Sequence, residues 1–178
     1  MKLIRTMQSI LSLVSELARL ADSFREMEER LKPGYLENQF DYVMPVNIPK
    51  FGTQAYLLLA LLADGKPHGV WEILIWTGST SGIRSALQLL TNPTSTGQTG
   101  YFWLIVNENE GTGKPAIYRL SELHLAGCTL KDAKARTEAE RQYLQRRKNV
   151  AKKGVVNAAK VVEEIARFEQ EHPGHKVP

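Results

Sequence analysis

The strongest constraint on the fold is a seven-residue apolar repeat in the first 32 residues. One seam position of the repeat is occupied by Leu3, Ile10, Leu17, Phe24 and Leu31. The other seam position is occupied by Met7, Val14, Ala21 and Glu28. Such a repeat predicts an α-helix over residues 1–32 with one apolar face, and Pro33-Gly34 is expected to end it.

The apolar face of this predicted helix is wider than the seam of a two-stranded coiled coil. It is extended by Ile4, Leu11, Leu13, Leu20 and Met27. The helix is therefore expected to pack into a bundle. Two arrangements stay open: the face covers the core of its own chain, or it forms a subunit interface. The candidate interface residues are Leu3, Met7, Ile10, Val14, Leu17, Phe24 and Leu31.

A second long helix is predicted in the last region, residues 126–172, before a tail over residues 173–178. Thr129 is a suitable N-cap, and Pro173-Gly174 is expected to stop the helix. Gly154 marks a position for a break or kink. The half beyond Gly154 is expected to pair with the N-terminal helix and to take part in self-association through Val155, Val162 and Ile165.

Charge is unevenly distributed along the 178 residues. The formal net charge is +4, made up of −1 over residues 1–49, 0 over residues 50–125 and +5 over residues 126–178. The densest basic cluster consists of Arg146, Arg147, Lys148, Lys152 and Lys153. A cluster of this kind on a helix either contacts phosphate or forms a solvated face, and both alternatives stay open.

Residues 51–125 contain three short helical patterns followed by two strands, and residues 33–50 are expected to connect them to the first helix. Thr53 begins TQAYLLLALLADG, and VWEILIWTG closes at Gly78. Ser79 opens STSGIRSALQLL, whose apolar residues have helical spacing. Two short helices joined by a tight turn form a helix-turn-helix. The segments YFWLIVNE and KPAIYRLSE, on either side of a glycine-containing tip, predict a β-hairpin.

The order of helix, short extended piece, helix, helix and hairpin resembles the winged helix-turn-helix domain of bacterial and phage regulators. The resemblance rests on LLALLADGKPHGVWEI, on STSGIRSALQLL at the recognition-helix position, and on GTGKPAIYRL at the wing and closing strand. It implies a mainly α fold with a small β-hairpin wing, flanked by long N- and C-terminal helices. The whole chain also resembles, in architecture alone, the dimeric MarR-like regulators.

This resemblance implies a homodimeric transcriptional regulator that binds double-stranded DNA. A recognition helix of this type lies in the major groove, and the wing touches the backbone or the minor groove. By position, the contacts fall on Ser79, Thr80, Ser81, Arg84, Ser85, Gln88 and Lys114. Arginine pairs well with guanine and glutamine with adenine. However, the predicted recognition helix has one cation, and Glu108 and Glu110 lie at the wing tip.

Two other functions stay open. The first is a non-enzymatic structural or assembly protein that uses the winged helix and the long helices for protein contacts. The neutral charge of residues 50–125 and the six consecutive apolar residues at 101–106 favour this protein-binding alternative. The second is a phage-type accessory factor for DNA packaging or replication, which would bind DNA through the same chemistry.

The sequence carries no motif that indicates catalysis, a cofactor or a metal site. Cys128 is the single cysteine, and GTGK at 111–114 lacks the other residues of a phosphate-binding loop. The four histidines have no metal-ligand spacing and are expected at the surface, whereas Trp71, Trp76 and Trp103 are expected in the core. We therefore expect a protein that is not an enzyme and needs no cofactor.

The sequence also predicts a cytoplasmic protein without a membrane segment. The first residues lack the continuous apolar region of a signal peptide, because polar residues interrupt them from Gln8 onward. The longest apolar run, residues 56–63, is far shorter than the ~20 residues that cross a bilayer.

Overall fold

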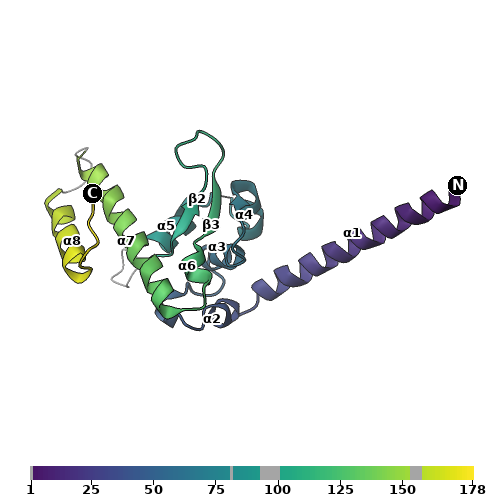
Figure 1. Cartoon of the computed structure of the whole chain (residues 1–178), viewed down its shortest axis with the longest axis horizontal. Coiled ribbons are helices and arrows are strands. Elements are labelled where there is room, and N and C mark those ends of the chain that lie inside the picture. Colours follow the sequence, from purple (N-terminus) through teal and green to yellow (C-terminus); the bar gives the residue numbers. More distant parts are fainter. Residues whose placement is uncertain (1, 81, 93–100, 153–157) are drawn as a thin grey trace.

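The computed structural model describes residues 2–80, 82–92, 101–152 and 158–178 (Figure 1). Within these residues the chain is mainly helical with a three-stranded antiparallel sheet, which confirms the predicted fold class at this level. The elements are α1 (Lys2–Arg30), α2 (Tyr35–Gln39), a 3₁₀ turn (Pro45–Asn47), α3 (Gln54–Leu62), β1 (His68–Gly69), α4 (Val70–Thr77), α5 (Arg84–Thr91), β2 (Ile105–Asn107), β3 (Ile117–Leu120), α6 (Glu122–Leu125), α7 (Thr129–Lys152) and α8 (Ala158–Glu171).

Helix α3 lies at the centre of the fold. It begins after Thr53, whose side-chain oxygen accepts a hydrogen bond from the backbone N–H of Tyr56 at 3.2 Å, so the predicted N-cap is confirmed. Helices α2, α4 and α5 and strand β3 contact α3. The consecutive residues Leu58, Leu59, Ala60 and Leu61, which point to different sides of the helix, are all buried. A helix that is apolar all round must be enclosed in this way.

The segment over residues 33–50 is more than the connector that its prolines suggest. Leu36 and Phe40 are fully buried, and Val43 and Ile48 are buried beside them. The ring centroid of Phe40 lies 4.9 Å from that of Trp103. The prolines break the helical pattern of this segment, but they do not prevent its apolar side chains from packing into the core.

Helix α4 ends as predicted, whereas α5 begins later than predicted. Gly78 caps α4 at φ = +60°, a conformation that favours glycine. Helix α5 begins at Arg84, not at Ser79. Between them Gly82 has φ = +91°, which lies outside the helical region, and its carbonyl accepts a hydrogen bond from the Ser79 hydroxyl at 3.0 Å. Ser79 therefore belongs to the turn before α5.

The sheet has the strand order β1-β3-β2. Strands β2 and β3 form the predicted hairpin, with Ile105 opposite Leu120, and the short extended piece at residues 68–69 is β1, paired with β3. Strand β2 is shorter than predicted because residues 101–104 form hydrogen bonds outside the sheet. The backbone N–H of Trp103 bonds to the last turn of α5, and that of Leu104 bonds to the ring of His124.

The C-terminal region is two packed helices where one long helix is predicted. Figure 1 shows α8 lying alongside α7, at the end of the molecule opposite to α1. Phe168 of α8 is buried with Leu144 of α7 and Val177. The expectation that this half pairs with the N-terminal helix is therefore wrong, because α8 packs on α7 through Ile165 and Phe168, at the opposite end of the molecule from α1. The predicted break at Gly154 lies outside the described residues.

Two histidines expected at the surface are buried. His124 is fully buried: its Nε2 accepts a hydrogen bond from the backbone N–H of Leu104 at 2.9 Å, and its Nδ1 lies 2.6 Å from Oδ1 of Asp132. The Leu104 bond therefore indicates a neutral ring with its proton on Nδ1. Burial lowers the pKa of His124, and this outweighs the opposing effect of the Asp132 carboxylate.

Arg136 completes this buried network and joins it to the core. Its Nε donates to Oδ2 of Asp132 at 2.7 Å, and its guanidinium carbon lies 4.4 Å from the ring centroid of Trp103. Burial acts to raise the pKa of Asp132, but the hydrogen bonds from His124 and Arg136 lower it overall. The network attaches α6 and α7 to residues 101–104.

His68 is buried in a different environment. Its Nε2 lies 2.9 Å from Oδ1 of Asp64, and its Nδ1 lies 2.9 Å from Oε1 of Glu72. Burial acts to lower the pKa of His68, but the two carboxylates raise it overall. The pKa values of His68 and His124 thus shift in opposite directions, although both side chains are buried.

The three tryptophans differ in burial. Trp103 is fully buried and Trp76 packs against the core, in agreement with the sequence. Trp71 is 79% exposed on α4, so its expected place in the core is wrong. The apolar spacing of α4 does not distinguish its inner face from its outer face, because apolar residues occupy both.

We predict that in the His124→Gln variant the free energy of unfolding falls less on acidification than it does in the wild type. Below the ordinary histidine pKa of ~6.5, His124 binds a proton in the unfolded chain but stays neutral in the folded protein, because burial lowers its pKa. Acidification therefore favours the unfolded chain, by at most ~1.4 kcal/mol per pH unit. Urea unfolding followed by circular dichroism at pH 7.5 and 5.5 measures the effect. Relative to wild type, the variant should gain stability on acidification.

The matched control is His68→Gln, for which the opposite sign is expected. The stability that His68 contributes is fully present below the pKa of the unfolded chain and is lost as pH rises through the higher folded pKa. Removing it should therefore cost more stability at pH 5.5 than at pH 7.5. Identical pH dependence in wild type and His124→Gln would contradict a neutral His124.

Candidate nucleic-acid interface

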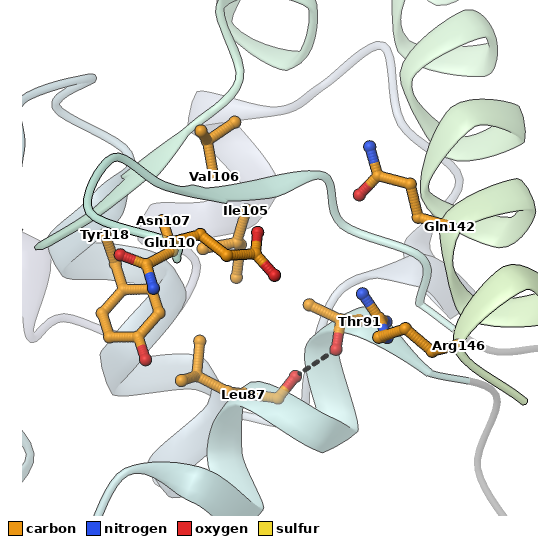
Figure 2. A pocket seen from close by; sticks show the side chains of 9 residues that line it. All are labelled: Leu87, Thr91, Ile105, Val106, Asn107, Glu110, Tyr118, Gln142 and Arg146. Atoms are coloured by element: carbon orange, nitrogen blue, oxygen red, sulfur yellow. Dashed lines mark hydrogen bonds between the residues drawn. The ribbon is translucent and has the colours of Figure 1, made fainter. Parts of the chain in front are cut away.

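A cleft lies between α5, the β2–β3 hairpin and α7. It comprises two adjoining cavities of about 320 and 450 Å³. Figure 2 shows the first, with side chains from all three elements directed toward one space. The two cavities share Leu87, Thr91, Tyr118 and Arg146. We call this feature the α5–α7 cleft.

Helix α5 presents a polar outer face beside this cleft. Ile83, Ala86 and Leu90 are buried, as the helical spacing predicts. On the other side of the helix, Arg84, Ser85 and Gln88 are exposed, and Arg84 and Gln88 line the second cavity. The predicted contact residues of the helix are therefore accessible to a large partner.

The hairpin forms the second wall of the cleft, and its turn is held by side-chain hydrogen bonds. Oδ1 of Asn107 accepts from the backbone N–H of Asn109 at 3.1 Å and from that of Ile117 at 3.3 Å. Glu110 lines the first cavity, and Figure 2 shows its carboxylate directed into that space. Lys114 is exposed near the tip of the hairpin.

Ion pairs reduce the negative charge of the hairpin. Arg119 Nε lies 3.1 Å from Oε1 of Glu108, and its Nη1 lies 3.0 Å from Oε1 of Glu122. Glu108 therefore does not oppose a negatively charged partner as strongly as its place in the sequence suggests. Within the described residues, no ion pair is formed by Arg84, Lys114 or Arg146.

Helix α7 forms the third wall of the cleft through Gln142 and Arg146, which lie one turn apart on the same face. Nη2 of Arg146 donates to Oδ1 of Asn92, just after α5, at 3.3 Å. This hydrogen bond places the Arg146 guanidinium beside the end of α5. The cleft thus combines exposed groups of α5 with a cation from a helix distant in sequence.

Arg147 and Lys148 of the basic cluster form their contacts away from the cleft. Arg147 forms an ion pair with Glu164 of α8, and its guanidinium carbon lies 5.7 Å from the ring centroid of Tyr143. Nζ of Lys148 donates to the carbonyl oxygens of Val177 at 3.2 Å and Pro178 at 3.0 Å. Lys152 is exposed, and Lys153 lies outside the described residues. Arg146 is therefore the cluster member that lines the cleft.

The predicted DNA-contact residues before α5 differ in their accessibility. Ser79 is buried and bonded within its turn, so it does not face a partner. Thr80 is exposed, and Ser81 lies outside the described residues. The sequence prediction did not include Asn107, Tyr118 and Gln142. Gln142 stands four residues before Arg146, a helical spacing that could have identified it, whereas Tyr118 and Asn107 depend on the hairpin register.

The predicted self-association residues also differ in their exposure. Val14, Leu17 and Phe24 on α1 and Leu31 directly after it are exposed, and Leu3, Met7 and Ile10 lie earlier in α1. In α8, Val162 is 65% exposed and Ile165 packs beside Leu144, while Val155 lies outside the described residues. From residue 11 onward, the apolar face of α1 therefore does not cover the core of its own chain.

The described residues contain no cluster of three His, Cys, Asp or Glu side chains that could hold a metal ion. Among the helices of this part of the chain, none has the length and apolar character required to cross a bilayer. Comparisons with protein-family models, curated proteins and solved structures give no match.

We predict that Ser79→Ala changes stability and that Thr80→Ala does not. Removing the Ser79 hydroxyl loses its hydrogen bond to the Gly82 carbonyl, so the free energy of unfolding should fall by about 1–2 kcal/mol. Thr80 is exposed, and its replacement should change that energy by less than about 0.5 kcal/mol. Equal effects of the two substitutions in urea unfolding would show that Ser79 does not hold the turn.

Proposed function

We propose that this protein is a sequence-selective, double-stranded DNA-binding regulator of the winged helix-turn-helix type that acts as a homodimer. The observation that carries the proposal is the exposed outer face of α5, with Arg84 and Gln88 beside the cleft and Arg146 of α7 next to it. The element order α3, β1, α4, α5, β2, β3 is that of the winged helix described above. In this proposal α5 is the recognition helix and the β2–β3 hairpin is the wing.

The exposed groups of α5 have the chemistry for reading base edges. The Arg84 guanidinium has the geometry for two hydrogen bonds to guanine, and the Gln88 amide has the geometry for two to adenine. Ser85 is small and lets the helix approach the groove closely. These residues occupy one exposed face of a helix whose opposite face is fixed in the core.

Cations outside α5 supply the attraction to phosphate. Arg146 lies beside the end of α5, and Lys114 lies on the hairpin. The Arg119–Glu108 ion pair reduces repulsion from the wing. Since few free cations surround the cleft, the affinity for random DNA should be modest and fall with salt, while selectivity depends on α5.

A second function, protein assembly, is favoured by a separate observation. Apolar side chains are exposed along α1, and on α4 Trp71 and Ile75 are 79% and 82% exposed. An extended apolar surface of this kind marks a protein-binding site. An assembly protein would use these surfaces and would bind no duplex selectively, so gel shifts with random and selected duplexes at two salt concentrations separate the two functions.

We predict that Arg84→Ala reduces selectivity more than general affinity for DNA. Loss of a bidentate base contact should cost about 1–3 kcal/mol on the preferred duplex and much less on random duplex. The matched control is Arg167→Ala, which removes an exposed arginine of α8, the helix that packs on α7. An equal loss of affinity for both duplexes would show that Arg84 contacts only phosphate. No loss of affinity for either duplex would show that α5 is not the recognition helix.

We further predict that Arg146 and Arg147 differ in the salt dependence of binding. A side chain that neutralises one phosphate contributes about −0.9 to the slope of log K against log salt. Arg146→Gln should flatten that slope by about this amount per subunit. Arg147→Gln should leave it unchanged, because Glu164 already neutralises Arg147. A wild-type slope for Arg146→Gln would exclude Arg146 from the DNA interface.

A further inference from the structure

In the part of the chain that the structure describes, helix α1 contacts the body of the fold through its C-terminal end. Near its last turn, Nη1 of Arg30 lies 3.1 Å from Oδ2 of Asp64 and donates to the carbonyl of Leu61 at 3.3 Å. The remainder of the helix extends away from the body (Figure 1). From residue 11 to residue 24 its large apolar side chains are exposed, including Leu17 at 64% and Phe24 at 65%.

The exposed face of α1 is continuous with an apolar ridge on α4. A cavity of about 580 Å³ lies between the C-terminal part of α1 and the α3–α4 region. It is lined on one side by Met27 of α1 and by Leu31 directly after α1, and on the other side by Ile75 and Trp76 of α4. Trp71 stands one turn before Ile75 and is also exposed. We call this cavity, which has one wall from the end of α1 and one from α4, the α1–α4 groove. Trp71 lies beside it on α4.

Charge along α1 indicates what fills this groove. Residues 2–15 carry two basic residues and no acidic residue, whereas residues 22–30 carry four acidic and two basic residues. The halves of α1 therefore differ in sign, and both carry the apolar repeat. Two copies of α1 that run antiparallel bring opposite charges together, whereas parallel copies bring like charges together.

We propose that a second copy of this chain pairs through α1 in the antiparallel direction, with the N-terminal half of each α1 lying in the α1–α4 groove of the other copy. The groove adjoins the acidic half of α1, and Glu26 and Glu72 line it. An isologous two-fold pair covers both grooves with the same contact. This inference rests on the self-association part of the proposed function and specifies its geometry.

The proposed geometry gives a measurable distance. The stripe from Leu3 to Leu31 is centred on Leu17, so antiparallel helices cross near that residue. Glu29 is exposed, and two copies of position 29 would lie about 36 Å apart along the axis at ~1.5 Å per residue. In a parallel pair they would face each other across an interaxial distance of about 8–10 Å plus the lengths of their side chains.

The experiment measures that distance and the contribution of α4 in the full-length protein. Spin labels are attached to Glu29→Cys in a Cys128→Ser background, and pulsed dipolar spectroscopy gives the distance between them. Light scattering or sedimentation gives the dimer dissociation constant without DNA. We expect a dimer with a label distance near the antiparallel value. A dimer with the shorter, parallel distance overturns the antiparallel arrangement.

Variants of the ridge test whether the groove is occupied. Replacing Trp71 and Ile75 together by alanine should raise the dimer dissociation constant at least about tenfold, since exposed side chains are removed from the interface but not from the core. Leu130→Ala, at an 81% exposed leucine on α7, is the control and should leave the constant within about twofold. Equal effects of the ridge and control variants overturn the groove as part of the interface.

The outcomes also separate this inference from the DNA-binding proposal. A wild-type protein that stays monomeric at micromolar concentration overturns the inference, while Arg84 still reports on DNA binding by the monomer. An antiparallel dimer that binds no duplex supports the inference and contradicts the DNA-binding proposal. Leu17→Asp should prevent dimerisation. The circular dichroism of the fold outside α1 should stay unchanged, which would show that the loss of the dimer is not caused by unfolding.

Discussion

Helix α3 is apolar on every side and must therefore be shielded from water all round, and this requirement determines how the rest of the molecule is arranged. Helix α3 is enclosed by α2, α4, α5 and β3, and each of these elements contributes one covering surface. Because α5 is fixed by Ile83, Ala86 and Leu90 on its inner face, its outer face is held at a constant orientation. The candidate site therefore depends on packing that lies entirely behind it.

The parts of the fold that could be predicted from the sequence are those with local causes. Thr53 and Gly78 mark the ends of helices through their own side chain or backbone preference, and both positions agree with the structure. The start of α5 was misplaced because Gly82 adopts a positive φ that no sequence period reports. Residues 101–104 were predicted as strand because their hydrogen-bond partners, such as His124, lie far away in sequence.

The same distinction applies to the candidate site. Helical spacing correctly predicted that Arg84 and Gln88 would be on the exposed face of α5. It could not separate Arg146 from Arg147, because the difference depends on Glu164, which α8 brings back beside α7. Likewise, Glu108 looks unfavourable for DNA until the hairpin register places Arg119 beside it. Long-range pairing, not composition, sets the effective charge of this surface.

The attachment of α1 at one end has a mechanical consequence. A helix of 29 residues is about 43 Å long, so a rotation of about 10° at its base displaces its far end by roughly 7 Å. In a pair joined through α1, the angle at the Arg30–Asp64 contact would control the separation of the two copies of α5. In the proposed DNA-binding dimer, this joint would adjust the distance between the two recognition helices to DNA half-sites that lie ~34 Å apart, one helical turn from centre to centre.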